Sequence, residues 1–497
     1  MLASCTENFE EINRDPNNPT VVSTGSLLSN AQKGLVDDIY DEWFSGRQSY
    51  VYSQFLAQRN YTEEDRYQLR QPVNNNYWTF IYGDIMDLQE IINLNTKDKT
   101  GGKPNEIAVA RILKAWAMQI MTDAYGDVPY FDAFKAEGDV SPEYTPQDLI
   151  YADLLKELTE ASAQLNTAEP AFGDADLIYG GDTEKWQKLA NSLKLRVAIR
   201  MSKADAGYKT YITQALSAPG GVFTSNDDNA LLRYVGSAPN VDAAPMYDAY
   251  YYSNRDDFSL SKQLVDALKG ENDVLNGKTN PFVGLVDPRL SVWAVPGGPE
   301  YEGMPYGITN DLTAAARPGT IDFLDGGVVA AGNLGVPLMD YAEVCFILSE
   351  ANNWDQTWYE TGVEASLERW GAEGDEVGSK PSDYDAQVAA YLAALPPANQ
   401  ERVLTQKYFA LFMNGYEAWA EIRRTGYPLL LVLPGQITYK TSGGTNIKFE
   451  ALVDTGGDIP ARLNYPVLEQ SLNAVSYKAA VGRMPADDLK SKVWWDK

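Results

Sequence analysis

Histidine is absent from the 497 residues, and its absence excludes several classes of chemistry at once. Neither a Ser-His-Asp triad, nor a Cys-His pair, nor a histidine-ligated zinc site can be built without imidazole. Cysteine is almost as scarce, with only Cys5 and Cys345. Cys345 lies in the apolar run MDYAEVCFILSEA, which predicts a buried and unreactive thiol. We therefore expect no catalytic metal and no cofactor, with calcium bound through oxygen ligands as the permitted exception.

Long apolar runs and positive charge are also in short supply. No stretch approaches the ~18 apolar residues that are needed to cross a bilayer. Lys and Arg number 41 against 69 Asp and Glu, which gives a formal net charge of −28. Such a surface repels phosphate backbones and anionic headgroups, so nucleic acid is excluded as a partner. Any attachment to a membrane must therefore come from something other than electrostatics.

The first residues, MLASC, are similar to a bacterial lipobox, although the charged part and most of the apolar part of a signal peptide are missing. On this interpretation Cys5 is the acylated first residue of the mature protein, and its acyl chains form a lipid anchor. The alternative is an ordinary cysteine near a terminus. Residues 6–20 are acidic and rich in Asn and Pro, which is typical of an extended linker. We predict a lipobox remnant and flexible tether over residues 1–22.

Helical periodicity dominates the first half of the chain. Between Glu106 and Gly126 apolar residues recur at spacings of three and four, and Gly126 followed by Pro129 ends the helix. Paired helices that each bury one face on a neighbour form TPR-like stacks, although no clean 34-residue repeat is present. The predicted fold class is all-α, with stacked TPR-like helical pairs, a loop-rich block and few short strands. Further helices are expected over residues 146–165, 183–202, 208–216, 338–352, 363–370, 384–395 and 399–424.

The loop-rich block, about 226–335, is where we expect a ligand to bind, because a rigid scaffold can hold variable loops. Gly, Pro, Asn and Asp are frequent there, as in PGGPEYEGMPYG. These residue types keep the chain out of regular structure and are predicted to leave aromatic faces exposed. The candidate ligand-binding residues of this block are Trp293, Tyr301, Tyr306 and Asn310. For Trp293 a core position remains an equal alternative.

A second candidate surface lies in the first helical pair. Its candidate ligand-binding residues are Trp43, Tyr52 and Trp78, which sit among Gln and Asn residues. For Trp78 a core position is favoured, because it shares helical spacing with three apolar residues that follow it, Ile81, Ile85 and Leu88.

Carboxylates are abundant, but no pattern among them identifies a site. Asp227 with Asp228, or Asp256 with Asp257, could bind calcium, yet no EF-hand spacing is present. Solvated loop acids are the favoured interpretation of both pairs. The 69 acidic residues offer many pairs of carboxylates of the kind a glycosidase uses, so an enzyme that cleaves glycans stays as a rival hypothesis.

Several segments, in the right order, resemble the SusD/RagB family. They include RILKAWAMQIMTDAYGDVPYFDA (111–133), WQKLANSLKLRVAIR (186–200), VPLMDYAEVCFILSEA (336–351), TQKYFALFMNGYEAWAEIRRTGYP (405–428) and DIPARLNYP (458–466). Each also has a purely structural explanation: Arg423 and Arg424, for example, lie in the last turn of a predicted helix, where they face the negative end of its dipole. The shared segments therefore indicate a fold and do not identify a ligand.

The resemblance implies one SusD-like helical domain over residues 23–497 and a binding protein rather than an enzyme. It further implies a lipoprotein on the extracellular face of the outer membrane, of the type found in Bacteroidetes, that delivers a nutrient to a SusC-like TonB-dependent transporter. An oligosaccharide is the expected ligand, with a peptide or another solute as the alternative. A helical scaffold that binds only proteins is a third hypothesis, because TPR-like stacking alone would support it.

Overall fold

The computed structural model describes residues 22–98, 102–135, 141–236, 241–295, 300–317 and 327–497. Within these ranges helices dominate, as the sequence predicts. The α-helices are α2 (Thr24–Tyr40), α3 (Ser49–Tyr52), α4 (Gln71–Lys97), α5 (Pro104–Tyr125), α6 (Gln147–Gln164), α7 (Thr183–Arg200), α8 (Tyr208–Ser217), α9 (Pro245–Tyr247), α10 (Lys262–Leu268), α11 (Arg289–Trp293), α12 (Asn310–Ala316), α13 (Tyr341–Ala351), α14 (Gln356–Val377), α15 (Tyr384–Ala394), α16 (Gln400–Ala410), α17 (Gly415–Thr425), α18 (Val467–Leu472) and α19 (Ala474–Val481).

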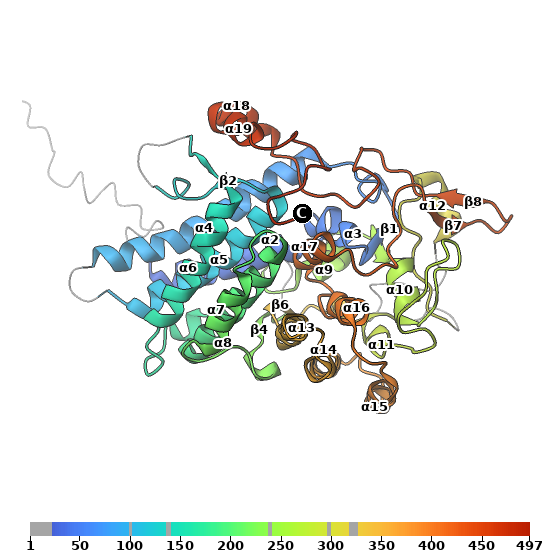
Figure 1. Cartoon of the computed structure of the whole chain (residues 1–497), viewed down its shortest axis with the longest axis horizontal. Coiled ribbons are helices and arrows are strands. Elements are labelled where there is room, and N and C mark those ends of the chain that lie inside the picture. The colour runs from blue at the N-terminus through green and yellow to red at the C-terminus, as the bar shows by residue number, and fades with distance from the viewer. Residues whose placement is uncertain (1–21, 99–101, 136–140, 237–240, 296–299, 318–326) are drawn as a thin grey trace, which may run out of the picture.

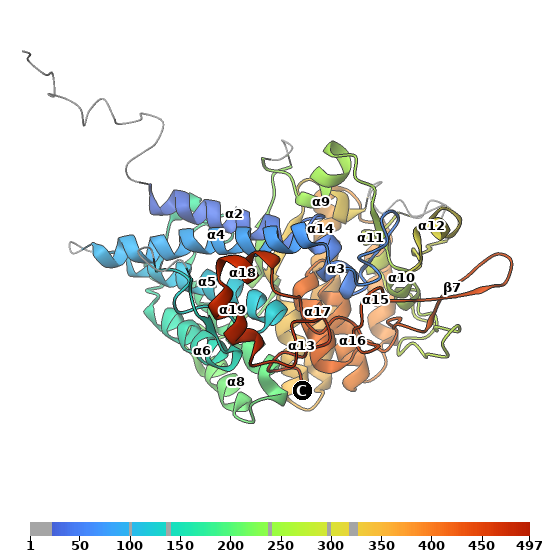
Figure 2. The same cartoon turned by 90° about the horizontal axis from the view of Figure 1, so that it is seen from above.

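Successive long helices pack against one another as stacked pairs. Helix α4 contacts α2 and α5, α6 contacts α5 and α7, and α8 continues the stack on α7. Helices α13, α14 and α16 form a second group, which Figure 1 shows beside the first. Seen from above, α2 and α4 run side by side over one face (Figure 2). The predicted all-α, TPR-like architecture is confirmed.

Of the four short antiparallel strand pairs in the described residues, two connect segments that are far apart in the sequence. Strand β1 (Leu56–Gln58) pairs with β5 (Phe258–Leu260), and β4 (Ala230–Arg233) pairs with β6 (Gly335–Met339). The other two pairs are β2 (Val128–Pro129) with β3 (Tyr144–Thr145), and β7 (Ile437–Lys440) with β8 (Asn446–Lys448). The hairpin of β7 and β8 projects from the body in both views (Figures 1 and 2).

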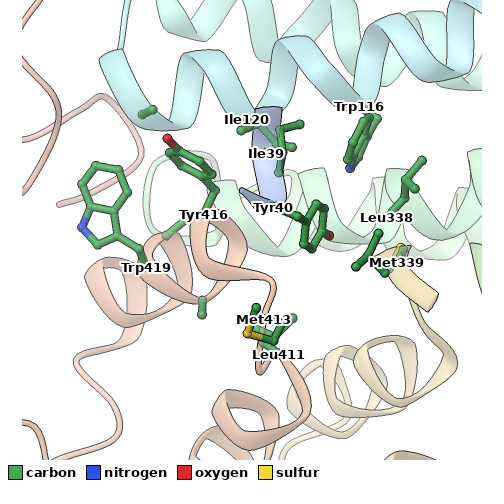
Figure 3. Packing of buried hydrophobic residues seen from close by; sticks show 14 of the residues in the cluster. Ile39, Tyr40, Trp116, Ile120, Leu338, Met339, Leu411, Met413, Tyr416 and Trp419 are labelled. Carbon is green, nitrogen blue, oxygen red and sulfur yellow. The ribbon is translucent and has the colours of Figure 1, made fainter. Parts of the chain in front are cut away.

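The hydrophobic core continues across the contact between the two helical groups. Figure 3 shows side chains from α2, α5, β6 and α17 meeting there. Tyr40 and Trp116 face Leu338 and Met339 on β6, and the Tyr416 ring points from α17 toward α5; all are buried. Because these residues come from opposite halves of the chain, neither helical group can bury its apolar face alone.

A network of buried ion pairs also joins the halves. Arg196 on α7 donates to Glu343 on α13 at 2.7 Å (Nε to Oε1), and Arg200 pairs with Glu417 on α17. Arg424 bridges Glu350 (2.6 Å) and Glu421 (2.8 Å). Each charge has a partner of opposite sign, which is the condition under which charges can be buried.

Arg423 and Arg424 are structural, as predicted. The Arg423 guanidinium donates to the carbonyl oxygens of Asp123 and Ala461, both at 2.8 Å, and lies 3.8 Å from the Trp419 ring centroid. The predicted helix ends are confirmed as well. Gly126 (φ 86°) ends α5, a backbone conformation that side chains with a Cβ rarely adopt.

Three of the expected helices differ from the structure. The segment 399–424 is two helices, α16 and α17, because Met413 takes a positive φ of 67° between them. The segment 338–352 begins as strand β6 and turns helical only at Tyr341, where Asp340 caps the helix by accepting from the Glu343 N–H at 3.0 Å. The segment 363–370 is the middle of the much longer α14.

The loop-rich block, 226–335, contains more regular structure than expected. Its described residues include strands β4 and β5 and the short helices α9 to α12. Trp293, a candidate of this block, is the last residue of helix α11. The block therefore packs against the helical body and is not a set of exposed loops.

The C-terminal segment packs into the first helical group. Trp495 is fully buried, and its indole N–H donates to Asp123 Oδ1 at 2.8 Å. Arg462 donates to the Tyr125 carbonyl oxygen at 3.1 Å and pairs with Asp487 at 2.8 Å. The end of α5 is thus covered by residues that lie more than 300 positions later in the sequence.

Candidate functional site

A cavity of about 450 Å³ opens at the C-terminal end of α2. This volume falls in the range of pockets that hold small ligands. One wall is formed by the last turns of α2 and the turn that follows it, and the other by residues 243–255, which include α9. The lining residues are Lys33, Asp37, Asp38, Asp41, Glu42, Trp43, Ala243, Pro245, Asp248, Ala249, Ser253 and Arg255.

Trp43 supplies an aromatic surface to this cavity. Its side chain is 37% exposed, and its indole lies 4.4 Å from the guanidinium carbon of Arg47, which is buried beneath it. Asp41 fixes the turn that carries Trp43, because Asp41 Oδ1 accepts from the backbone N–H of Phe44 at 2.5 Å and of Ser45 at 3.3 Å. A ring that is both exposed and held in place is suited to stack on a flat ligand.

A cluster of tyrosines belongs to the same segment, 243–255, but does not line the cavity. It comprises Tyr247, Tyr251 and Tyr252, carried by α9 and by the π-helical turn η5 (Asp248–Tyr252) that follows. The rings of Tyr247 and Tyr251 are 4.6 Å apart, and those of Tyr247 and Tyr252 are 5.7 Å apart. Tyr251 and Tyr252 are nearly half exposed. The sequence analysis missed this cluster, although the run AYYYSN signals it, because three successive aromatic residues on one turn cannot all face the core.

Asp38, which lines the cavity, forms a pair of carboxyl groups with Asp84 between α2 and α4. Asp38 is hydrogen-bonded to Asp84, and burial followed by the negative charges of Asp84, Asp41 and Asp37 raises the pKa of Asp38 to about 9. Burial likewise raises the pKa of Asp84 to about 7. Because two adjacent carboxylates repel each other, the pair retains a proton at neutral pH. We name these two residues the carboxyl pair.

The absence of a side chain at one glycine creates room for the carboxyl pair. A Cβ atom added to Gly34 on α2 would lie 2.5 Å from Asp84 Oδ1. Gly83, beside Asp84 on α4, has no such neighbour within 4 Å. The close approach of α2 and α4 at this point therefore depends on Gly34 in particular.

A set of paired charges joins the two walls below Trp43. Arg47 lies 3.4 Å from Glu42 and 3.2 Å from Asp257, and Arg255 lies 2.6 Å from the same Asp257. These pairs fix Arg255 and Glu42 where they line the cavity. The cavity thus combines fixed hydrogen-bond acceptors, a few donors and the exposed ring of Trp43, which together suit a polyhydroxylated ring better than an apolar molecule.

Of the seven ligand-binding residues predicted from the sequence, only Trp43 lines this cavity. The expectation that Trp293 and Tyr306 present exposed rings is wrong, because both are fully buried. Trp293 stacks on Phe412 at 4.0 Å and meets Trp370 edge-on at 5.2 Å, and Tyr306 packs edge-on against Phe449 at 5.4 Å. The glycines and prolines near these residues therefore do not leave the two rings exposed.

The remaining predicted residues are placed as follows. Tyr52 is fully buried against Trp419, so it is not part of a binding surface. Trp78, 7% exposed, lies in the core, as its helical spacing indicates. Tyr301 is half buried and packs on the core, and Asn310 is exposed at the start of α12. Cys5 lies outside the described residues.

The loop acids are better paired than expected. Asp228 is buried, accepts from the Thr224 N–H at 2.7 Å and pairs with Lys188 at 2.9 Å. Asp257 is buried between the two arginines named above, so for these two residues the solvated interpretation is wrong. In the described part of the chain, no group of three or more Asp, Glu or Cys side chains is arranged to hold a metal ion.

Two further observations concern chemistry and the membrane. Cys345 is buried, as predicted, and burial raises the pKa of its thiol to about 12, which disfavours the reactive thiolate. Among the described helices, none is both long enough and apolar enough to cross a bilayer.

Comparisons with known proteins agree on one family. Residues 16–466 match the family model SusD-like_2, described as "Starch-binding associating with outer membrane". A solved chitin-binding protein is 28% identical, with a TM-score of 0.74, and the match covers 96% of this chain and 100% of that one. No curated protein matches the chain.

Two more solved structures show the same fold at lower identity. A SusD homologue from Parabacteroides distasonis is 22% identical, with a TM-score of 0.77 over 96% of this chain and 98% of its own. A chitin-binding SusD homologue from Flavobacterium johnsoniae is 22% identical, with a TM-score of 0.72 over 95% of this chain and 98% of its own.

Proposed function

Since the chain belongs to the SusD-like family, whose model matches residues 16–466, we propose that it captures a glycan at the cell surface in the cavity beside Trp43. The observation that carries this proposal is the exposed indole of Trp43 over a cavity rich in fixed acceptors. Sugar rings present apolar faces that stack on aromatic side chains, and hydroxyl groups that donate to carboxylates. The task is binding, in keeping with the family, rather than cleavage of a bond.

The charge of the cavity narrows the class of glycan. Five carboxyl groups line it, Asp37, Asp38, Asp41, Glu42 and Asp248, against two basic side chains. A negatively charged sugar would find no basic side chain without a partner, because Lys33 pairs with Asp37 and Arg255 pairs with Asp257, whereas neutral and amino sugars need none. The 28% identical relative is called a chitin-binding protein, and chitin is built from neutral N-acetylated sugars, which supports neutral oligosaccharides as the first ligands to test.

Calorimetry with a panel of chito-oligosaccharides, malto-oligosaccharides and peptides tests this proposal. We expect a neutral oligosaccharide to bind, and Trp43→Ala to weaken its binding by about 10- to 30-fold, the effect of removing an aromatic anchor. Tyr61→Ala is the matched control, because Tyr61 is another exposed ring that does not line this cavity. The melting temperature should be unchanged in both variants, since neither side chain is in the core.

Two results would contradict the proposal. If Trp43→Ala binds the identified glycan as tightly as the wild type does, the ligand lies elsewhere. If only peptides bind, the substrate class is wrong although capture remains the function. Incubation of the protein with the bound oligosaccharide, followed by analysis for shortened products, tests the rival hypothesis of a glycan-cleaving enzyme.

We also propose that the protein is held on the extracellular face of the outer membrane by acyl chains on Cys5 and delivers its ligand to a SusC-like TonB-dependent transporter. The lipobox-like MLASC sequence and the family description support this proposal. Cys5→Ala should release the protein from the membrane in cells that lack the transporter, because the acidic body has no electrostatic means of attachment. A variant that still sediments with outer membrane in those cells would refute the anchor.

A further inference from the structure

A second cavity, of about 470 Å³, lies among α4, α5, α6 and the segment after β2. It shares no lining residue with the cavity beside Trp43. Its lining residues are Gln89, Ile92, Ile107, Arg111, Lys114, Ala115, Tyr130, Phe131, Phe134, Lys135, Asp153 and Glu157. Its volume, like that of the first, suits a small ligand.

Lys114 is the unusual group in this cavity. Its ammonium donates to Gln89 Oε1 at 2.6 Å and lies 4.2 Å from the centroid of the Phe134 ring. The Gln89 amide is held in turn, since its Nε2 donates to Asn93 Oδ1 at 3.0 Å. No carboxylate of the described residues lies within ion-pair distance of Lys114. One neutral acceptor and an aromatic face leave a positive charge that is only partly compensated.

The other charged groups that line the cavity have partners of their own. Arg111 forms a two-point pair with Glu157, at 2.7 and 3.0 Å. Asp153 accepts from the Tyr130 hydroxyl at 3.0 Å, and Lys135 pairs with Asp132. The carboxylates of the lining therefore accept hydrogen bonds from other donors. Lys114 is the charged group of the lining that a ligand can pair with.

Aromatic and aliphatic surface surrounds this charge. The Phe131 ring is 53% exposed and meets Tyr130 edge-on at 5.0 Å, and Ile92 and Ile107 add apolar surface. An exposed phenyl ring beside a partly buried ammonium offers two contacts at once, one for a ring face and one for an anion.

From this arrangement we propose that the second cavity binds an acidic sugar, with the carboxylate of a hexuronic acid residue accepting from Lys114 and a face of its ring resting on Phe131. A carboxylate would supply the counter-charge that Lys114 lacks among the described residues, in a site where water screens the attraction only weakly. The site does not depend on the function proposed for the first cavity, whose acidic lining disfavours such a ligand.

Calorimetry with trigalacturonate, and with galactotriose as its neutral counterpart, tests this site in the full-length protein. The wild type should bind trigalacturonate in preference to galactotriose. Lys114→Met should weaken trigalacturonate binding by at least about tenfold, because it removes the charged donor. Lys209→Met is the matched control, since Lys209 is an exposed lysine on α8 outside the cavity. Phe131→Ala, a surface change that leaves the core intact, should weaken binding of the same ligand.

The pH provides a separate readout. Burial lowers the pKa of Lys114 to about 8, although nearby Glu157 and Asp153 act in the opposite direction. Trigalacturonate binding should therefore weaken between pH 7 and pH 9 in the wild type and show no such decline in Lys114→Met. Arg111, another basic group of the lining, remains protonated over this range, because its hydrogen bonds to Glu157 raise its pKa.

Several results would overturn the proposal. They are the absence of trigalacturonate binding by the wild type, equal binding by the wild type and Lys114→Met, and equal affinity for galactotriose. Trp43→Ala should leave trigalacturonate binding intact, so a failure at one cavity is distinguishable from a failure at the other.

Discussion

The carboxyl pair, Asp38 and Asp84, makes the stability of the protein depend on pH in a predictable direction. In the unfolded chain both groups lose their protons near the ordinary value of 3.8, whereas in the folded protein the pKa is raised to about 9 for Asp38 and about 7 for Asp84. The unfolded state therefore binds fewer protons between about pH 4 and pH 9. The free energy of unfolding should fall as the pH rises through this window.

Asp38→Asn tests this reasoning. Each unit of raised pKa corresponds to about 1.4 kcal/mol, but both side chains keep some contact with solvent, so the full shift overstates the cost. We expect the variant to be more stable than the wild type by about 1–3 kcal/mol at pH 8 and equally stable at pH 4. The asparagine amide can still donate to Asp84, so the contact between α2 and α4 is retained.

Urea unfolding followed by tryptophan fluorescence at pH 4, 6 and 8 measures the difference. Asp227→Asn is the matched control, because Asp227 is exposed, and its stability should follow that of the wild type at every pH. A difference between Asp38→Asn and the wild type that is the same at all three pH values, or that is largest at pH 4, would show that the pair does not hold the proton we assign to it.

Three further predictions concern stability and binding. Trp293→Ala should cost about 3–5 kcal/mol of stability, because it leaves a large cavity in the core, while glycan affinity measured by calorimetry stays that of the wild type. Gly34→Ala should lower the melting temperature, since the added Cβ would lie 2.5 Å from a carboxyl oxygen. Gly83→Ala should raise the melting temperature slightly, because the added Cβ has no neighbour within 4 Å and alanine favours the helix. Glu417→Gln should lower the free energy of unfolding by about 3–5 kcal/mol, because it leaves Arg200 buried without its main partner. A loss below about 1 kcal/mol in urea unfolding would contradict that account.

The helices could be predicted from the sequence where one apolar face and a clear stop signal coincide. The expected helix 183–202 is observed as Thr183–Arg200, and 208–216 as Tyr208–Ser217. The length of helix α14 was underestimated because glycines interrupt its sequence pattern. Added Cβ atoms at Gly362 and Gly371 would lie 3.0 Å from Phe346 and 2.7 Å from Tyr384, so these glycines serve close packing and do not break the helix.

The binding surface could be predicted only in part, because the exposure of a ring in an irregular segment depends on partners that local sequence does not reveal. Trp293 is covered by Phe412, which follows it by more than a hundred residues, and no periodicity near Trp293 signals that contact. Trp43 lines the cavity for the opposite reason, since Arg47 fills the space beneath it and leaves its other face toward solvent. The carboxyl pair is likewise a tertiary feature, made by two helices that meet at Gly34.

The burial of Trp495 against Asp123 has a consequence for biosynthesis. These residues are 372 positions apart, and the hydrogen bond between them cannot form until almost the whole chain has emerged from the ribosome. The nascent chain must therefore keep the end of α5 uncovered while later segments are still being made. Contacts of such high sequence separation slow folding, because a long loop must close before they stabilise the chain. The end of α5 therefore reaches its native surroundings only after the last residues of the chain have been made.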